Sequence, residues 1–221
     1  MCGHFTIGAI TLKQILERYN LDRQQTELAF DEAAVKGGFY PSRKATTTHV
    51  PVVLERNGKR LAELQRWDLV PHWWKKPLAE KKYSSYNARS DSLLEKATFK
   101  GAWAKGRRCI IPATMFFEWP DKDLMQRGIK RREHKIELAD TEIFSMAGIW
   151  DECVAGEPKG LRSCAIITTG ANKLMTTIPH TRMPVILPPE KEELWLSADT
   201  KVESAFEMLH KYPGEHMRIV E

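Results

Sequence analysis

The chain has 221 residues, 42% of them hydrophobic and 7 of them tryptophan, a composition typical of globular proteins that excludes a disordered chain. Its 34 lysines and arginines against 29 acidic residues give a net charge of +5, which favours an anionic partner only weakly. No apolar run approaches the ~18 residues that span a membrane, and the cysteines at 2, 109, 153 and 164 lack the CxxC spacing of a zinc site. We therefore expect a cytoplasmic protein with neither a metal nor a cofactor.

The first predicted elements are a helix and a hairpin. Apolar positions at helical spacing predict a helix over 11–19 with Thr11 as its cap. A β-branched and then apolar run predicts a strand over 45–54. The Asn57-Gly58 pair predicts a two-residue turn from this strand into a second strand over 61–70.

Strand patterns dominate the centre of the chain, and helical patterns lie between and after them. Strands are expected over 108–111, 114–119, 134–138, 143–150 and 164–169, and helices over 92–104, 171–177, 189–196 and 202–210. The charged stretch 121–133 is expected to form an exposed hairpin loop. Because strands and helices do not alternate strictly, we predict an α+β fold. It is expected to be a single domain over 1–221 with a curled, partly closed, mixed and mostly antiparallel β-sheet core flanked by helices.

The chain begins MCGHF, with a cysteine directly behind the initiator methionine. Methionine aminopeptidases remove Met1 when the next side chain is small, and the mature chain is then expected to begin with Cys2, which carries a free amine beside a thiol. These two groups titrate near pH ~8 and ~8.5 in model peptides, so either can act as a nucleophile. The alternative is that Cys2 packs as a small hydrophobic residue of a first strand.

Three further polar residues stand in unusual surroundings. Asn87 and Arg89 are two residues apart, so in an extended segment their side chains point to the same face. Asn87 would then orient a ligand through hydrogen bonds, and Arg89 would bind a phosphate through two hydrogen bonds. The alternative is a surface polar pair. Glu118 lies between Phe117 and Trp119, where burial would suit it to proton transfer, although an outward orientation is the alternative.

A histidine and a tryptophan pair complete the candidate residues. His180 and Arg182 lie between two prolines, and a rigid turn of this kind presents a general acid or base, unless the histidine is structural. Trp73 and Trp74 precede Lys75 in a proline-bounded loop, a combination that suits stacking on unpaired bases, with packing under the loop as the alternative. No HxxxH or HExxH spacing indicates a metal site.

These motifs together resemble one family. The chain resembles the SOS-response-associated peptidase (SRAP) family in its motifs and in their order along the sequence. These motifs are MCGHF, RWDLVPHWW, YNARSDSL, FKGAWAKGRRCIIPATMFFEW, FSMAGIW and IITTGANKLMTTIPHTRMPVIL. The resemblance implies a monomeric DNA-damage-response protein that binds single-stranded DNA at abasic sites and links its N-terminal cysteine to the sugar aldehyde. The family name includes "peptidase", but we expect proteolysis to be at most self-removal of Met1. The family's functional residues fall on Cys2, Asn87, Arg89, Glu118 and His180.

The chemistry of an abasic sugar suits these positions. His180 is expected to donate a proton to the ring oxygen, and the Cys2 amine then adds to the exposed aldehyde to give an imine while Glu118 moves the protons. The Cys2 sulfur closes on the imine carbon to form a thiazolidine, and the same steps run backward for reversal. Asn87 is expected to hold the linkage. The DNA-binding residues are expected to be Arg89, Trp73, Trp74, His4, Lys75 and Arg182.

Three positions depart from the family pattern. The family usually has arginine at His4, asparagine at Tyr40 and glutamate at Asp91. We expect these departures to alter affinity or salt dependence and to leave the chemistry intact.

Two other functions compete with the abasic-site prediction. An N-terminal-nucleophile amidohydrolase also begins MCG and uses the thiol of its cysteine on an amide. A noncatalytic binder of single-stranded DNA would use only Trp73, Trp74 and the basic loops.

Overall fold

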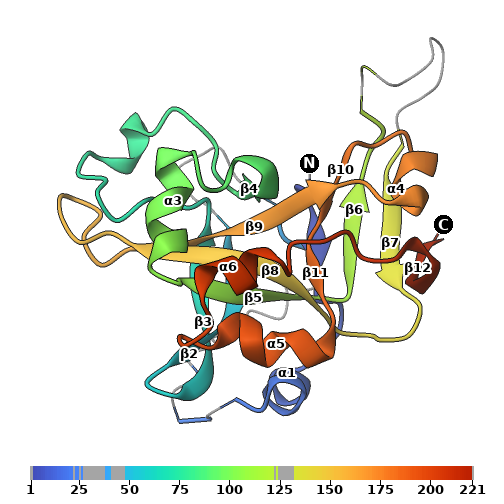
Figure 1. The fold of residues 1–221 in the computed structure, drawn as a ribbon, viewed down its shortest axis with the longest axis horizontal. Coiled ribbons are helices and arrows are strands. Elements are labelled where there is room, and N and C mark those ends of the chain that lie inside the picture. The colour runs from blue at the N-terminus through green and yellow to red at the C-terminus, as the bar shows by residue number, and fades with distance from the viewer. Residues whose placement is uncertain are drawn as a thin grey trace.

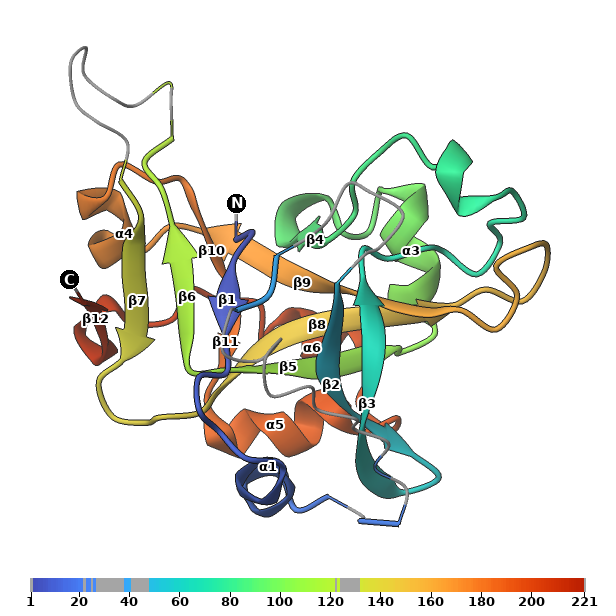
Figure 2. The ribbon, with the colours of Figure 1, turned by 180° about the vertical axis from the view of Figure 1, so that it is seen from behind.

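The structure is a computed structural model that describes residues 2–21, 23–24, 26, 38–40, 48–121, 123 and 132–220. Within these residues the strands form an eight-stranded sheet and a four-stranded sheet, with the helices packed around them (Figures 1 and 2). None of the helices in this part of the chain has the length and apolar run needed to cross a membrane.

The eight-stranded sheet is curled, and five of its strands close into a ring. Its strands are β2 (His49–Arg56), β3 (Lys59–Trp67), β4 (Asn87–Arg89), β5 (Arg108–Ala113), β8 (Phe144–Glu152), β9 (Arg162–Gly170), β10 (Arg182–Pro184) and β11 (Ile186–Leu187). Pairing runs β9-β3-β2-β5-β8 and returns from β8 to β9, and the β3–β9 pair is the parallel one within this ring. The short β4 also pairs with β9 in parallel. The predicted α+β fold with a curled, partly closed, mostly antiparallel sheet is confirmed.

Close packing inside the ring constrains one residue of β8. A Cβ added at Gly148 would lie 2.9 Å from the Cys109 sulfur and 3.2 Å from the Ala165 carbonyl oxygen. Glycine at this position therefore lets β5, β8 and β9 approach one another.

The four-stranded sheet is an addition that the sequence patterns did not predict as a separate unit. It consists of β1 (Phe5–Thr6), β6 (Met115–Glu118), β7 (His134–Leu138) and β12 (Met217–Val220), each antiparallel to its neighbour. Thr114 alone separates β5 from β6, so the chain passes directly from the ring into this sheet. Phe116 of β6 packs edge-on against Phe144 of β8, and the buried residues of both sheets form one core.

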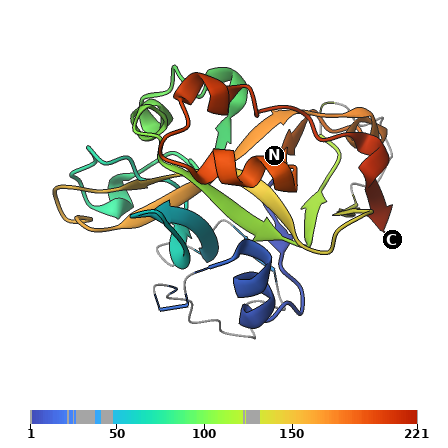
Figure 3. The same ribbon diagram turned by 60° about the horizontal axis from the view of Figure 1, so that its bottom comes forward.

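Short helices cover the sheets. They are α1 (Leu12–Tyr19), α3 (Ala97–Ala104), α4 (Lys173–Thr177), α5 (Pro189–Leu196) and α6 (Val202–Phe206), with single 3₁₀ turns at Leu78–Glu80, Ser90–Ser92 and Gly214–His216. Figure 3 shows α5 lying across β5. The Trp195 indole there donates to the Cys109 carbonyl at 2.8 Å, so this helix is fixed to the ring by a buried hydrogen bond as well as by packing.

Local signals placed several elements correctly. Thr11 caps α1 and forms a capping box with Gln14, as the helix prediction requires. Asn57 and Gly58 both have positive φ, 53° and 70°, which is the geometry of the predicted two-residue turn. The helix predicted over 189–196 has the observed bounds of α5.

Other predicted bounds were wrong for identifiable reasons. The helix predicted over 92–104 begins at Ala97, because the backbone is extended at Lys96. The strand predicted to reach residue 70 ends at Trp67, because the next residue, Asp68, binds the Ser85 amide through its side chain. The helix predicted over 202–210 ends at Phe206.

Two predicted segments lie partly outside the described residues. The strand predicted over 45–54 is observed from His49 to Arg56, and its residues 45–47 are not among the described ones. Residues 122 and 124–131 of the predicted 121–133 loop are likewise outside the described residues. The strands before and after this loop pair with each other, with Glu118 opposite His134.

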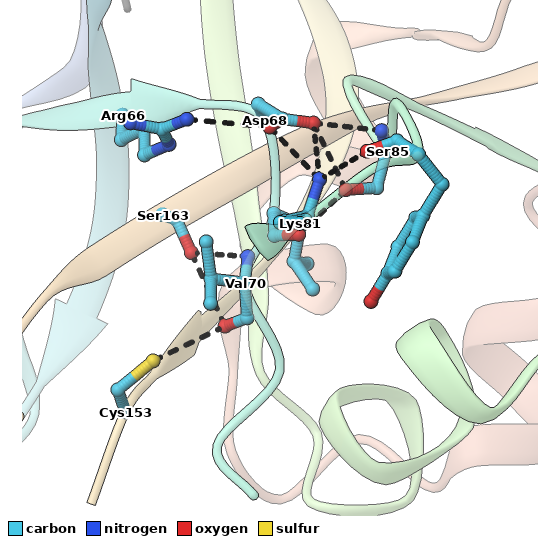
Figure 4. A network of polar contacts seen from close by, with 9 residues as sticks. Arg66, Asp68, Val70, Lys81, Ser85, Cys153 and Ser163 are labelled. Atoms are coloured by element: carbon cyan, nitrogen blue, oxygen red, sulfur yellow. Dashed lines mark hydrogen bonds and ion pairs between the residues drawn. The ribbon is translucent and has the colours of Figure 1, made fainter. Parts of the chain in front are cut away.

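A buried polar network fixes both ends of the segment between β3 and β4 (Figure 4). The two oxygens of Asp68 accept bonds from Lys81 Nζ at 2.9 and 2.8 Å, and Oδ1 also accepts from the Ser85 backbone at 2.7 Å. The Val70 amide donates to Ser163 Oγ of β9 at 2.8 Å. Because Asp68 begins this segment and Ser85 ends it, the network sets where β4 can meet β9.

We predict that Lys81→Ala lowers the free energy of unfolding by about 3 kcal/mol, because it leaves the Asp68 carboxylate without its principal cation. Lys81 has a side chain only 2% exposed. Urea denaturation measures the loss. The adjacent Lys82 is exposed, and Lys82→Ala is the matched control, with a change within about 0.5 kcal/mol. Equal effects of the two substitutions would contradict the role given to the network.

Candidate active site

The N-terminal residues lie between two other backbone segments. Phe5 of β1 pairs with Phe116 of β6 on one side and forms an isolated antiparallel bridge with Phe39 on the other. The amide of Phe117 donates to the His4 carbonyl at 2.9 Å, which extends the pairing toward the start of the chain. Cys2 and Gly3 therefore lie alongside the carboxyl end of β6, where Glu118 is found.

Cys2 is fully buried and is held through its backbone. Asn87 Nδ2 of β4 donates to the Cys2 carbonyl at 2.8 Å. Burial, together with the nearby charge of Glu118, raises the pKa of the Cys2 thiol well above its ordinary value. The sulfur is therefore a protonated thiol at neutral pH, and burial alone agrees with the alternative of a packed hydrophobic residue.

Glu118 and His180 form a buried pair next to this residue. Glu118 is 1% exposed, so the alternative in which it faces solvent is wrong. Its Oε2 lies 3.1 Å from His180 Nε2, and the other ring nitrogen, Nδ1, lies 3.1 Å from Asp121 Oδ1. With carboxylates facing both nitrogens, the imidazole can donate or accept protons on either side.

Asp121 extends this pair to the protein surface. Its Oδ2 accepts from the Thr181 amide at 3.0 Å and from Thr181 Oγ1 at 2.6 Å. Partial burial opposes ionisation, but the Thr181 hydrogen bonds and the charge of His180 hold the pKa of Asp121 below its ordinary value. Thr181, Asp121, His180 and Glu118 thus form a continuous chain of polar contacts from the surface to the buried carboxylate.

Two arginines share one carboxylate at the edge of the site. Arg89 Nε and Nη2 donate to the two oxygens of Asp91 at 3.0 and 2.8 Å, and Arg182 Nη1 donates to Asp91 Oδ2 at 3.0 Å. β4 is extended, so Arg89 and Asn87 leave the same side of that strand, as predicted. The three charges leave one net positive charge at this edge, with the Arg89 side chain largely exposed.

His4 does not have the exposed position that a direct phosphate contact requires. Its ring is 5% exposed and stacks between the rings of Tyr40 and Phe117, with both centroid distances 3.8 Å. Burial lowers the pKa of His4, although Glu133 at 3.2 Å opposes that shift. The structure also shows that two departures from the family pattern, His4 and Tyr40, are in contact.

Trp73, Trp74 and Lys75 lie away from this cluster. Their loop packs on the connection between β8 and β9, where the Val154 amide donates to the His72 carbonyl at 3.2 Å. Arg162 lies at that end of β9, whereas Thr168, six residues further along β9, pairs with Arg89. The loop and Arg89 are therefore separated by about 20 Å along the strand. Figures 1 and 2 show the loop projecting beyond β4 and α3, away from β6 and β7. Trp73 is exposed, and its role as a stacking platform stays a prediction.

Arg107 and Arg108, a basic pair at the start of β5, bind other groups of the protein. Arg107 pairs with the buried Asp151. The Arg108 guanidinium is buried and donates to the Trp195 carbonyl at 2.7 Å. Neither side chain is arranged as a free phosphate contact.

Sequence reasoning missed Asp121 and Thr181. Asp121 stands in a charged run that reads as a solvated loop, and Thr181 lies between two residues that were singled out. Only the approach of the residue 179–182 turn to the end of β6 brings them together, with the Asp121 amide donating to the Pro179 carbonyl at 2.9 Å. Among the described residues, no group of three or more His, Cys, Asp or Glu side chains is arranged to hold a metal ion.

The fold and this site define a small α+β protein with a candidate cysteine nucleophile, a buried carboxylate–imidazole pair and a cationic edge. The family model "SOS response associated peptidase (SRAP)" matches residues 1–221, and the chain belongs to this family.

Relatives and solved structures agree with that assignment. The chain is 34% identical to Abasic site processing protein YoqW of Bacillus subtilis (strain 168), over 98% of this chain and 90% of the relative. It is 30% identical to Abasic site processing protein HMCES of Gallus gallus, over 98% of this chain and 71% of that protein. A crystal structure of a Bacteroides thetaiotaomicron protein aligns with a TM-score of 0.78 at 27% identity, covering 99% of this chain and 90% of that one.

We predict that Arg89→Ala raises the pKa of Asp91, which hydrogen bonds from Arg89 and the charge of Arg182 hold at about 2. An acid with a depressed pKa in the folded state stabilises the protein above its unfolded pKa of about 3.9, and this stability is lost as the pH falls toward 2. Carboxyl NMR titration measures the shift, and acid unfolding between these pH values becomes less steep in the variant. An unchanged Asp91 titration would show that the pair does not persist in solution.

Proposed function

We propose that this protein, once Met1 is removed, captures abasic sites in single-stranded DNA through a covalent bond to Cys2. The observation that carries the proposal is the position of Cys2, beside the buried Glu118–His180 pair and fixed by Asn87. The names of the YoqW and HMCES relatives support the substrate. These names, which describe abasic site processing, also favour this reaction over amide hydrolysis by the Cys2 thiol.

The reaction begins with opening of the sugar. An abasic deoxyribose is mostly a closed hemiacetal. His180 donates a proton to the ring oxygen as the bond from C1′ to that oxygen breaks. The C1′ hydroxyl proton passes to Glu118 and from there back to His180, which leaves the open aldehyde. Glu118, 3.1 Å from His180, accepts the proton that the Cys2 ammonium must lose before it attacks. Asp121 on the other side of the ring keeps the imidazole oriented.

Bond formation then proceeds in two steps. The Cys2 amine adds to the aldehyde carbon. Glu118 gives a proton to the resulting hydroxyl, which leaves as water, and takes the nitrogen proton in return, so that an imine forms. The thiol adds to the imine carbon and its proton passes to the nitrogen, which closes a five-membered thiazolidine.

The cationic edge supplies a place for the DNA backbone. Arg89 is largely exposed, and its guanidinium can exchange part of its contact with Asp91 for a phosphate oxygen. Arg182 is more buried and donates to the Thr168 carbonyl at 2.6 Å, so we assign it the support of this edge. The partner in this proposal is single-stranded DNA with an abasic site, bound by a monomer.

We predict that wild-type protein and a single-stranded oligonucleotide with one abasic site form an adduct on des-Met protein. Its intact mass equals the sum of the two molecules less one water, and peptide mapping places it on Cys2. Cys2→Ser abolishes the stable product, because a hydroxyl closes no thiazolidine.

The matched control for this experiment is Cys153→Ser. Cys153 is also buried, and burial raises the pKa of its thiol to about 11, but it lies on the Val70 side of the fold. This variant is expected to crosslink as wild type does. An adduct that survives Cys2→Ser, or release of ammonia from glutamine by the wild type, would refute the proposed function.

We predict that Glu118→Gln and His180→Gln each slow adduct formation by roughly 10²- to 10⁴-fold, the usual contribution of a positioned acid or base. Because the two side chains act through one contact, the double variant is expected to lose little more than either single variant. Single-turnover kinetics of crosslinking measure these rates. Losses that multiply in the double variant would show that the groups act independently.

A further inference from the structure

Three backbone segments place aromatic side chains in two parallel rows. Phe5 pairs with Phe39 on one side and with Phe116 on the other, and these three rings are buried in the core. Alternate residues of extended segments face opposite sides, so the neighbours of these phenylalanines form a second row. That outer row consists of Tyr40, His4 and Phe117.

The outer row is a continuous stack of rings. The Tyr40–His4 and His4–Phe117 centroids are each 3.8 Å apart, with interplanar angles of 21° and 10°. Phe117 and His4 are buried, whereas Tyr40 is 49% exposed. Since one face of Tyr40 is covered by His4, its exposed area lies on the opposite face and the ring edge. The stack therefore ends in an open aromatic surface.

Contacts on either side of His4 hold the stack in place. Its Nδ1 lies 3.2 Å from Glu133 Oε2, which fixes the ring within its plane. Gly38 has φ of +77°, and a Cβ there would lie 2.6 Å from His4 Nε2, so only glycine leaves room for the ring. The stack is thus formed before any ligand arrives, which reduces the entropic cost of stacking one more ring on it.

The stack also borders the candidate active site. His4 is two residues from Cys2, about 7 Å along an extended segment, and Phe117 directly precedes Glu118. We propose that the open face of Tyr40 stacks on the unpaired nucleobase next to the abasic nucleotide, an inference that rests on the proposed function. Every nucleobase has a π face, so this contact tolerates any sequence around the lesion.

The experiment uses single-stranded oligonucleotides that carry 2-aminopurine on the 5′ or the 3′ side of a tetrahydrofuran abasic analogue, which has no aldehyde and cannot crosslink. Wild-type protein is expected to quench the fluorescence at one of the two positions. Tyr40→Ala removes that quenching and weakens affinity by roughly 5- to 150-fold, the range for loss of one base–aromatic stack. Tyr40→Phe retains both, and Tyr40→Leu, which keeps bulk without a π face, loses the quenching.

Phe206→Ala is the matched control, because Phe206 is an aromatic residue on α6 that is 38% exposed and lies outside the stack. It is expected to bind and quench as wild type does. Absence of quenching in the wild type, or full quenching by Tyr40→Ala, would overturn the stacking proposal. A wild type that forms an adduct with a natural abasic site but shows no quenching refutes only the stack, whereas absence of the adduct refutes the proposed function itself.

Discussion

The arrangement of the candidate site depends on the pairing of β1 between Phe39 and β6. This short strand has only two residues, yet its backbone bonds on both sides set the positions of everything near the start of the chain. One face of the pairing contributes three phenylalanines to the core, and the other carries the stack that ends at Tyr40. Burial of the inner rings thus fixes the register, and the register brings Cys2 beside Glu118.

Local chemistry explains what the sequence could predict. A capping residue, a two-residue turn and alternating apolar positions act over a few neighbouring residues, so α1, the β2–β3 turn and most strands of the ring were foreseen. The candidate site residues were predicted on other grounds. Glu118 was singled out because a carboxylate among aromatic residues is costly to bury, and His180 because a turn between two prolines presents a histidine rigidly. The structure places these two side chains in contact.

Contacts between distant segments explain what the sequence could not predict. Asp121 belongs to a run of charged residues, and nothing in that run distinguishes the carboxylate that meets His180. Nothing in the sequence around His4 indicates that Tyr40, 36 positions later, covers its ring. The separation of Trp73 from Cys2 follows from the length of β9 and from the Asp68 network, which are properties of the assembled sheet.

The bond from Asn87 to Cys2 has a consequence for every state of the N-terminal residue. Asn87 binds the main-chain carbonyl, an oxygen that takes no part in the bond changes proposed at the amine and the sulfur. Oxidation, alkylation or attachment of a nucleic acid at the amine or the sulfur leaves the carbonyl oxygen free to accept this hydrogen bond. The amide that positions the unmodified Cys2 can therefore position a modified one as well, and this hydrogen bond need not break when the attached molecule is released.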